Sequence, residues 1–411
     1  MPDSPPSGFT KLWAAAGVSN LGDGVMGVAF PLLVASITRD PLLVAGATVA
    51  NRIPWFLFAL VSGALVDRMD RKRVMVVTDS VRFLLVGLLG VLLLAGDVGL
   101  PIIYAVAFGL GTAETFFDTS AEAIIPALVE PDRLESANGR LQATEWAANS
   151  FLGPPLGAAL FVAGAGLPFI FDSISFLVAA LLIATIGGTY RAQRTVEQTL
   201  GAEIGEGLHW LWGHTVLRTL SLMAGVTNLV AFGVIAIFVL FIQDIIGLGD
   251  FGYGVILSVM GVGGLLGALV SAKLVERLGQ GTALISSVSM LAILAVAMGS
   301  TSSSVVVAVI GAMFGLAITM WNVVAISLRQ RLTPDELRGR VASVARLLAW
   351  GTQPLGALLG GLVAGSFGLR APFFVAAAVW VAMLLSTLGI INNRRIAELV
   401  DEVTDASPSG T

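Results

Sequence analysis

The stretch Leu12–Ile37 reads LWAAAGVSNLGDGVMGVAFPLLVASI and contains a single charged residue, Asp23. A helix needs roughly 20 mostly apolar residues to cross the hydrocarbon core of a bilayer, so this stretch is long enough to span it. The apolar core of a signal peptide has only about 7–15 residues. We therefore interpret Leu12–Ile37 as a first membrane span that stays in the protein.

The rest of the chain has the same apolar character. Of 411 residues, 56% are hydrophobic and 12% are charged, whereas about 25% are charged in soluble domains. The composition predicts an all-α membrane protein. Hydropathy places twelve spans at 12–37, 42–65, 74–95, 101–121, 140–163, 168–188, 219–243, 253–274, 282–300, 304–327, 341–364 and 372–391.

Several function classes are disfavoured by composition. The chain has no cysteine, which excludes disulfides, thiol catalysis and thiolate metal sites. Two histidines, His209 and His214, do not make a metal site by themselves. The net charge is -4, and no basic block suits nucleic acid. We expect no metal, no cofactor and no nucleic-acid partner.

The positions of Lys and Arg predict the orientation in the membrane. With a cytoplasmic N-terminus, eighteen of the 23 Lys and Arg residues fall on the cytoplasmic side, and only Arg39 and Arg370 fall on the other side. Lys and Arg are enriched in the cytoplasmic loops of membrane proteins. We therefore expect both termini in the cytoplasm.

The two halves of the chain resemble each other. AGVSNL at 16–21 recurs as AGVTNL at 224–229, and GALV at 63–66 recurs at 267–270. PDRL at 131–134 likewise matches PDEL at 334–337. Six spans restore the original direction, so the repeat is parallel. We predict a six-helix half at 1–188, a cytoplasmic linker at 189–218, a second six-helix half at 219–391 and a cytoplasmic tail at 392–411.

The segment after the second predicted span reads Gly63-Ala-Leu-Val-Asp67-Arg68-Met-Asp70-Arg71-Lys-Arg73. It resembles the loop signature of the major facilitator superfamily, G-x-L-x-D-R-x-G-R-R/K, with Asp70 in place of the second glycine. The resemblance implies two six-helix halves that rock about a central substrate site, with charged residues holding a gate at the cytoplasmic side.

A second motif lies in the fifth predicted span, where Gly153-Pro154-Pro155-Leu156-Gly157-Ala158 is similar to the G-P-x-x-G-G element of proton-driven exporters in this superfamily. Ala158 replaces the last glycine, and Asn149 stands where an earlier glycine is usual. The alternative interpretation is a packing kink, since small residues let helices approach closely and proline bends them.

The whole chain resembles the third drug–proton antiporter group, which includes enterobactin exporters and macrolide efflux proteins. The residues that carry this resemblance are Gly22-Asp23, Arg52-Ile53-Pro54, Asp67-Arg-Met-Asp70-Arg71 and Ile125-Pro126-Ala-Leu-Val. It implies proton-coupled export of a hydrophobic or amphipathic small molecule (a drug, siderophore or lipophilic metabolite) by a monomer in a bacterial plasma membrane. An importer or facilitator of the same fold and a non-transporting receptor or scaffold remain alternatives. No motif points to an enzyme.

Two opposite charges are expected at one depth in the membrane. Asp23 lies ~17 Å into the first span at 1.5 Å per residue, and Arg52 lies at a similar depth in the next, antiparallel span. A charge at the bilayer centre costs at least roughly 2.5–3.5 kcal/mol, so we expect these residues to pair. Burial disfavours a charged carboxylate and a nearby cation favours it, which makes Asp23 a candidate proton site. The alternative is a permanent structural pair.

Other charged and aromatic residues complete the candidate set. We assign Glu114 to proton coupling with Asp23 and Arg52, with a role in the gate as its alternative. The resemblance implies a cytoplasmic gate made of Gly63, Asp67, Arg68, Arg71, Asp79, Arg82, Asp118 and Arg346. Trp146 and Trp350 are candidate substrate contacts, since lipophilic cations pack on aromatic rings. Glu122, Glu145 and Asp172 lie near predicted membrane edges, where we expect them to be solvated.

The acidic residues of the first half have no acidic counterparts in the second. At the offset of the repeat, Asp23 corresponds to Ala231, Asp79 to Ala283, Glu114 to Ile318, Asp118 to Asn322, Glu145 to Ala349 and Asp172 to Ala376. A carboxylate needed only to build a six-helix half would be present in both. We therefore predict that the first half handles protons.

Overall fold

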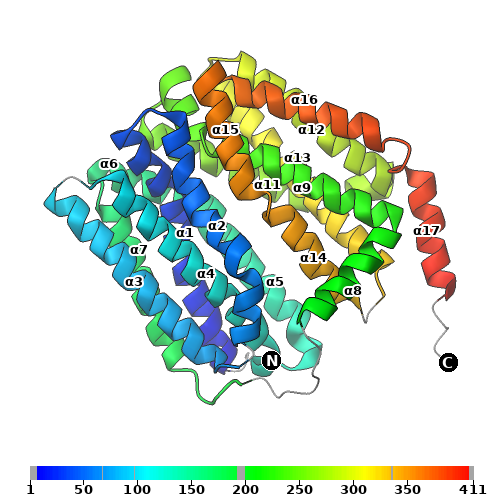
Figure 1. Cartoon of the computed structure of the whole chain (residues 1–411), viewed down its shortest axis with the longest axis horizontal. Coiled ribbons are helices and arrows are strands. Elements are labelled where there is room, and N and C mark those ends of the chain that lie inside the picture. The colour runs from blue at the N-terminus through cyan, green and yellow to red at the C-terminus, as the bar shows by residue number, and fades with distance from the viewer. Residues whose placement is uncertain (1–6, 67, 97, 192–199, 335–336, 407–411) are drawn as a thin grey trace. The chain divides into compact units, whose positions relative to one another are not determined.

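The computed structural model describes residues 7–66, 68–96, 98–191, 200–334 and 337–406, and every regular element in these ranges is helical (Figure 1). Ten helices in this part of the chain are long and apolar enough to cross a membrane. The prediction of an all-helical membrane protein is thus confirmed. The fifth expected span is divided by a π-helix, and the twelfth corresponds to an apolar helix of 17 residues, Ala371–Thr387.

The chain forms two compact units. Unit 1 consists of Met1–Glu197 and Ala236–Ser258, and unit 2 of Gln198–Ile235 and Val259–Thr411. The elements of unit 1 are α1 (Ser7–Ile37), α2 (Pro41–Val66), α3 (Arg71–Ala95), α4 (Leu100–Leu128), η1 (Pro131–Arg133), α5 (Leu134–Glu145), the π-helix η2 (Trp146–Leu152), α6 (Gly153–Ala163), α7 (Leu167–Ala184), α10 (Phe238–Leu240), the π-helix η3 (Phe241–Ile245) and the start of α11 (Asp250–Leu278).

Unit 2 contains the remaining helices. They are α8 (Leu200–Gly213), α9 (Thr215–Ile235), the rest of α11, α12 (Gln280–Ser300), α13 (Ser304–Leu332), α14 (Arg338–Trp350), α15 (Gln353–Phe367), α16 (Ala371–Thr387) and α17 (Asn393–Ala406). Helix α8 lies within the stretch predicted as a linker, and it packs against α9 and α14. Its Glu206 forms an ion pair with Arg340 of α14.

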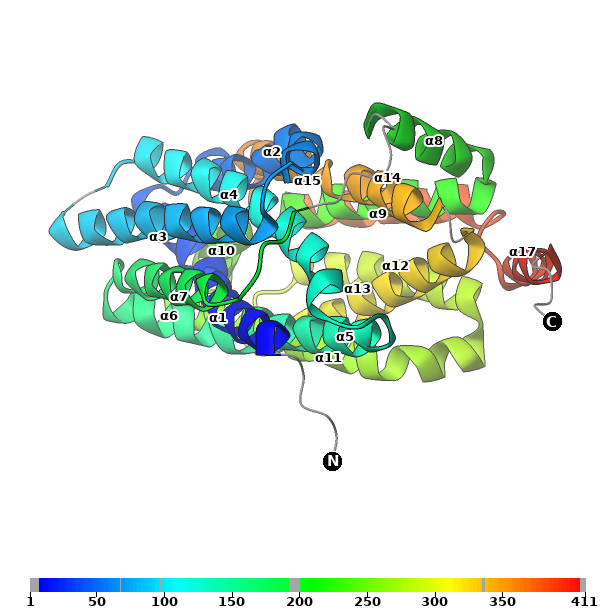
Figure 2. The same ribbon diagram turned by 90° about the horizontal axis from the view of Figure 1, so that it is seen from below.

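The packing pattern of unit 1 recurs in unit 2. In unit 1, α1 packs against α6 and α7 (Figure 2), and α3 packs against α4 and α7. In unit 2, α9 packs against α15 and α16, and α12 packs against α13 and α16. Local hydrogen bonds recur too. Asn20 donates to the carbonyl of Ala16 at 2.8 Å, and Asn228 donates to the carbonyl of Ala224 at 3.0 Å.

Glycines permit the closest contacts of α1. A Cβ placed on Gly24 would lie 2.8 Å from Asn149 Cα in η2, and one on Gly153 would lie 2.5 Å from Gly24 Cα. A Cβ on Gly157 would lie 2.5 Å from the carbonyl oxygen of Val25. Real Cβ atoms do not approach so closely, so the backbones of α1 and α6 touch only because these residues lack side chains.

The analogous contact exists in unit 2. A Cβ on Gly356 would overlap the carbonyl oxygen of Leu229, and a Cβ on Gly360 would overlap the backbone of Gly233. Helices α9 and α15 therefore meet backbone to backbone, as α1 and α6 do. The Gly-Pro element of the fifth span thus serves helix packing, whatever further role it has.

Helix α3 shows how charged residues are turned inward. Its exposed apolar side chains recur with a spacing of three or four residues, as expected for one helix face, and are Val77, Val81, Leu84, Leu88 and Val91. Its buried residues, which include Asp79, Arg82, Val86 and Leu89, lie on the opposite face. This is the arrangement expected when the outer face of a helix contacts lipid and its polar groups face the protein interior.

The contact between α1 and η2 can be tested with two substitutions in one helix. We expect Gly24→Ala to destabilise the protein by about 1–3 kcal/mol, because the added methyl overpacks the contact with Asn149. Gly27→Ala adds the same methyl where nothing lies within 4 Å, so it should be neutral or raise stability by up to about 1 kcal/mol. The thermal unfolding temperatures of the two variants in detergent measure the difference. Equal temperatures would contradict the predicted contact.

Candidate functional site

Asp79 and Arg82 of α3 form the buried centre of the site. The side chain of Asp79 is 0% exposed and that of Arg82 is 4% exposed, and Arg82 Nη1 lies 3.6 Å from Asp79 Oδ1. The guanidinium lies over two aromatic rings, at 4.9 Å from the centroid of Phe117 in α4 and 5.1 Å from that of Phe176 in α7. These rings favour the cation without neutralising it.

Asp79 is incompletely satisfied within this arrangement. Neither carboxylate oxygen has a hydrogen-bond partner in the described part of the chain, and both oxygens are buried. A buried charged group without full hydrogen bonding is costly. Ionisable residues within membrane helices are rare for this reason, and those that occur are functional candidates.

Arg52 of α2 lies beside Glu114 of α4. The distance from Arg52 Nη1 to Glu114 Oε1 is 3.9 Å, and both side chains are more than one third exposed. Arg52 also attracts Asp23 electrostatically. The pairing of Arg52 with Asp23 stays a prediction, and the structure adds Glu114 as a partner of Arg52.

Asp23 of α1 is half-buried and lies in the field of several charges. Arg82 attracts it most strongly and Arg52 more weakly, while Glu114 and Glu145 repel it. Arg82 in turn interacts with Asp79, Asp23, Glu114 and Asp118. Asp118 is exposed. The sequence analysis assigned Asp23 and Glu114 to proton coupling and assigned Asp79, Arg82 and Asp118 to a gate. In the structure these five residues interact electrostatically with one another.

Two glycines fix the position of Asp23. A Cβ on Gly22 would overlap Asp172 Oδ1 and Ser175 Oγ of α7, and a Cβ on Gly24 would meet η2. Glycines on both sides of Asp23 therefore let α1 approach α7 and η2 at once. The exporter-type residues Gly153 and Gly157, which pack against Gly24 and Val25, belong to the same contact.

Asp172 of α7 is a member of the site that the sequence analysis missed. It is 1% exposed, and Ser175 Oγ donates a hydrogen bond of 3.1 Å to its Oδ1. The expectation that Asp172 is solvated at a membrane edge is wrong. The side chain points toward Gly22 of α1 rather than along α7 toward solvent.

The repeat contains a signal that would have located Asp172. Gly22 and Asp172 correspond to Val230 and Ala376 of unit 2, which belong to one buried hydrophobic cluster. In unit 1 the carboxylate of Asp172 occupies the space left by Gly22. In unit 2 the glycine position holds valine and the aspartate position holds alanine, so the small and the large residue are exchanged.

The loop between α2 and α3 explains the departure of Asp70 from the signature. Asp70 caps α3, accepting a hydrogen bond of 3.2 Å from the backbone N–H of Arg73, and its other oxygen accepts one of 3.2 Å from the N–H of Tyr190. The Arg71 backbone N–H also donates to the Tyr190 carbonyl at 3.1 Å. Asp70 therefore ties the start of α3 to the segment after α7.

The remaining residues predicted for the gate make separate contacts. Arg71 donates to the carbonyl of Ala123 in α4 at 2.7 Å, and Arg68 is exposed. A Cβ placed on Gly63 would meet no neighbouring atom within 4 Å. Asp67 lies outside the described residues. Arg346 belongs to α14 of unit 2, where its guanidinium lies 5.7 Å from the centroid of the Trp350 ring.

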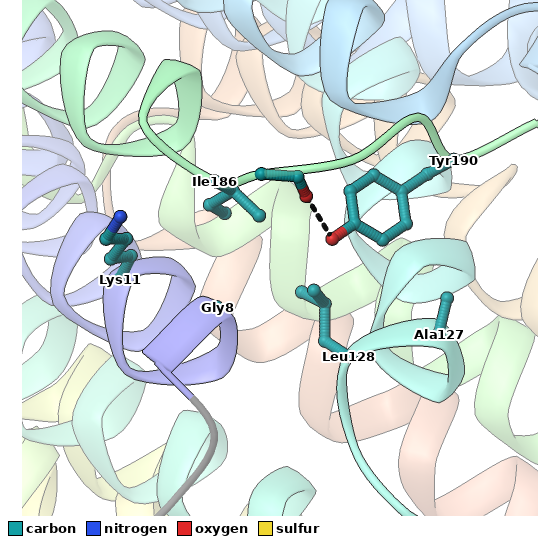
Figure 3. Close-up of a pocket in the computed structure, with 7 residues that line it drawn as sticks. Gly8, Lys11, Ala127, Leu128, Ile186 and Tyr190 are labelled. Atoms are coloured by element: carbon teal, nitrogen blue, oxygen red, sulfur yellow. Dashed lines mark hydrogen bonds between the residues drawn. The ribbon is translucent and has the colours of Figure 1, made fainter.

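A cavity of about 300 Å³ lies beside the Tyr190 tie, between α1, α4 and the segment after α7 (Figure 3). Tyr190 donates its hydroxyl to the carbonyl of Gly187 at 2.6 Å, and Lys11 donates to the carbonyl of Thr185 at 2.8 Å. The lining is formed by Gly8, Lys11, Ala127, Leu128, Ile186, Gly187 and Tyr190. None of the charged residues around Arg82 lines it.

The candidate aromatic residues lie in different surroundings. Trp146 begins η2 and is half-buried, and Trp350 ends α14 with 42% of its surface exposed. Within the described ranges, no group of three or more His, Cys, Asp or Glu side chains is placed to hold a metal ion.

The family described as transmembrane secretion effectors matches residues 6–407. Curated relatives cover nearly the whole chain. The "Multidrug efflux pump Tap" of Mycolicibacterium fortuitum is 29% identical over 398 residues, covering 92% of this chain and 93% of the relative. "Macrolide efflux protein A" of Streptococcus pyogenes is 22% identical over 387 residues, covering 92% and 94%.

Solved transporters share the fold. A point mutant of the nucleoside transporter NupG gives a TM-score of 0.77 at 9% identity, covering 94% of this chain and 100% of that one. A bacterial homologue of the iron transporter ferroportin in an inward-facing state gives 0.74 at 19% identity, covering 96% and 98%.

The exchange between the two units predicts a coupled pair of substitutions. Gly22→Val should clash with Asp172, and Asp172→Ala should leave a void, so each alone destabilises the protein. The double variant copies the residues at the matching positions of unit 2, Val230 and Ala376, which belong to one buried apolar cluster, and we expect the two effects to be coupled by about 1–3 kcal/mol. Thermal unfolding of the four proteins in detergent measures this coupling. Additive losses would show that Gly22 and Asp172 do not share one packing site.

The capping role of Asp70 predicts a stability difference between two substitutions. Asp70→Ala removes the cap and the tie to Tyr190, and we expect a loss of about 1–2 kcal/mol. Asp70→Asn keeps an acceptor for the Arg73 N–H and should lose less. Unfolding temperatures rank the two variants. An unchanged temperature for Asp70→Ala would contradict the cap and tie.

Proposed function

Because the chain belongs to the transmembrane secretion effector family of major facilitator transporters, we propose that it is a proton-coupled antiporter that exports hydrophobic or amphipathic small molecules. The curated relatives named as efflux pumps support export. The substrate class we propose includes drugs, siderophores and lipophilic metabolites. Transport proceeds by alternating access, in which the substrate site opens to one side of the membrane at a time.

One observation carries the proton coupling. Asp23, Asp79, Glu114 and Asp118 all interact electrostatically with a single buried cation, Arg82. Arg82 and the partly exposed Arg52 supply two positive charges for these four carboxylates, so the group is suited to taking up protons. The carboxylates are confined to unit 1, and their counterparts in the second half are Ala231, Ala283, Ile318 and Asn322.

Asp23 is the proton acceptor in this proposal. It is accessible enough to exchange protons, since it is only half-buried, and it lies on the helix that contacts both α6 and α7. Protonation removes its attraction to Arg82, which leaves the guanidinium to Asp79 at 3.6 Å. Because Gly22 and Gly24 pack α1 against its neighbours, a change at Asp23 is transmitted directly to the α1–α7 and α1–η2 contacts.

The supporting groups have separate roles. Glu114 relays protons toward Asp23, and Arg52, which keeps its charge, holds Glu114 in a partly exposed ion pair. Gly63, Asp67, Arg68 and Arg71 act at the cytoplasmic gate with Arg346, and Asp79, Arg82 and Asp118 link this gate to the proton site. Trp146 and Trp350 contact substrate.

The topology we propose has twelve spans, arranged as two related six-helix halves with both termini in the cytoplasm, and the protein acts as a monomer in a bacterial plasma membrane. Two observations support this. Helix contacts and glycine contacts recur in the two units, and eighteen of the 23 Lys and Arg residues fall on one side.

Purified protein in liposomes with an imposed pH gradient tests the proposal. The assay follows a panel of lipophilic cations, macrolides and siderophores. We expect gradient-driven movement of at least one compound, and we expect Asp23→Asn to reduce it at least about tenfold, because the amide cannot exchange a proton. Glu135→Gln is a matched control, since Glu135 lies in the first turn of α5 and is exposed.

The outcomes separate the alternatives. Movement that ignores both the gradient and Asp23→Asn would indicate a facilitator and reduce the carboxylates to a structural role. Movement toward the opposite side under the same gradient would indicate an importer. A folded protein that moves no compound of the panel would favour the receptor or scaffold alternative.

A further inference from the structure

The cavity of about 300 Å³ in unit 1 lies where α1 begins and where α4 and α7 end (Figure 3). Its lining residues come from the first turn of α1, the last turn of α4 and the segment that follows α7. The charged residues around Arg82 do not line it, and the transport proposal uses none of its lining residues.

Two glycines keep this cavity open. At the offset of the repeat, Gly8 corresponds to Val216 and Gly187 to Ile391. Val216 and Ile391 are 3% and 0% exposed and belong to one buried apolar cluster of unit 2. A Cβ placed on Gly187 would meet no neighbouring atom within 4 Å, so there is room for a larger side chain. The cavity is thus a feature of unit 1 that the architecture shared by the two units does not require.

Lys11 and Lys72 bring two ammonium groups to the wall of the cavity. Lys11 lines the cavity, and its Nζ donates to the carbonyl of Thr185 at 2.8 Å. Lys72 Nζ donates to the carbonyl of the lining residue Ile186 at 2.9 Å. An ammonium group has three N–H donors, so each lysine keeps two donors with no partner among the described residues.

The charge around the cavity is mainly positive. Arg71 donates to the carbonyl of Ala123 in α4 at 2.7 Å, one turn before the lining residue Ala127. Asp70 adds a carboxylate, but both of its oxygens already accept backbone N–H groups, one of them that of Tyr190. Of the described residues that line the cavity, none is acidic. Positive charge therefore exceeds negative charge here, which favours an anion.

The cavity also has an apolar wall. Leu128 and Ile186 are buried and form it, and Figure 3 shows them between Lys11 and Tyr190. The hydroxyl of Tyr190 donates to the carbonyl of Gly187 at 2.6 Å, and its oxygen can also accept a hydrogen bond. Cationic donors beside an apolar wall suit an amphipathic anion.

We propose that this cavity binds a phosphate group through the ammonium groups of Lys11 and Lys72. Hydrogen bonds between charged partners are strong ones, and lysine is a common phosphate ligand. The proposed topology places the cavity at the cytoplasmic edge of the membrane, where two sources carry this group: the head group of an anionic phospholipid and free phosphate. The apolar wall favours the lipid. The inference goes beyond the transport function, and its test needs no transported compound.

Binding of a soluble short-chain lipid tests the site directly. The full-length protein, purified in an uncharged detergent and freed of lipid, is titrated with dihexanoyl phosphatidylglycerol in a calorimeter. We expect saturable binding that Lys11→Gln weakens at least about fivefold, because a cationic donor is lost. Lys273→Gln is the matched control. It removes the same charge from an exposed position of α11 and should leave the affinity unchanged.

Gly187→Ile tests the space and leaves both lysines in place. It copies Ile391 of unit 2, and Gly187 does not have a positive φ, so isoleucine fits its backbone. We expect the affinity for dihexanoyl phosphatidylglycerol to fall at least about tenfold, because the added side chain occupies volume that the head group needs. The unfolding temperature should stay the same or rise, since filling a cavity restores packing.

Inorganic phosphate and dihexanoyl phosphatidylcholine identify the source of the phosphate group. Phosphatidylglycerol that binds at least about tenfold more tightly than both would identify an anionic lipid head group. Inorganic phosphate that binds as tightly as phosphatidylglycerol, and more weakly to Lys11→Gln, would identify free phosphate. Both results support a phosphate site at Lys11.

Two results would overturn the proposal. One is the absence of saturable binding of both phosphatidylglycerol and inorganic phosphate to the folded protein. The other is binding that Lys11→Gln leaves unchanged. Either result would reduce Lys11 and Lys72 to caps of the carbonyl groups at the end of α7.

Discussion

The buried guanidinium of Arg82 is the group around which unit 1 is arranged. A charge in an apolar interior requires compensation, and here Asp79 supplies it at 3.6 Å while the rings of Phe117 and Phe176 cover the cation. Because these contacts come from α3, α4 and α7, the cation joins three helices. Asp23 brings the fourth helix, α1, into the same field.

Glycine is what lets these helices come close enough to share that field. Gly22 gives room to Asp172, and Gly24, Gly153 and Gly157 bring the backbones of α1 and α6 together. Lipid provides no hydrophobic driving force between helices, so close packing and interhelical polar contacts hold them. Charge compensation and backbone contact therefore depend on each other at the centre of unit 1. Unit 2 keeps the glycine contacts, and the positions that match Asp23, Asp79, Glu114 and Asp118 carry no carboxylate. Helix packing in a six-helix unit therefore does not require these charges.

The segment between Ala236 and Ser258 adds a different kind of coupling. It belongs to the second half by sequence and to unit 1 by packing. Its Gly254 meets Ala158 of the Gly-Pro element, and that element also packs against α1 next to Asp23. One short helix, α6, thus contacts both α1 next to Asp23 and the segment Ala236–Ser258.

The sequence by itself determined the solvent, the helices and the family of this protein. Composition required lipid, hydropathy located the long apolar helices, and the loop signature with the Gly-Pro element pointed to the major facilitator superfamily. The repeat also separated the acidic residues of the first half from their neutral counterparts. These conclusions depend on local composition and on spacing along the chain, which the sequence contains completely.

Only the tertiary structure decided which charged groups meet. Depth along a helix can be counted from the sequence, but the face that a residue presents depends on how neighbouring helices are rotated. For this reason the sequence did not show that Arg52 lies beside Glu114 or that Asp172 is buried against Gly22. The tie of Asp70 to Tyr190 spans 120 residues, and no local pattern predicts a contact that helix packing creates.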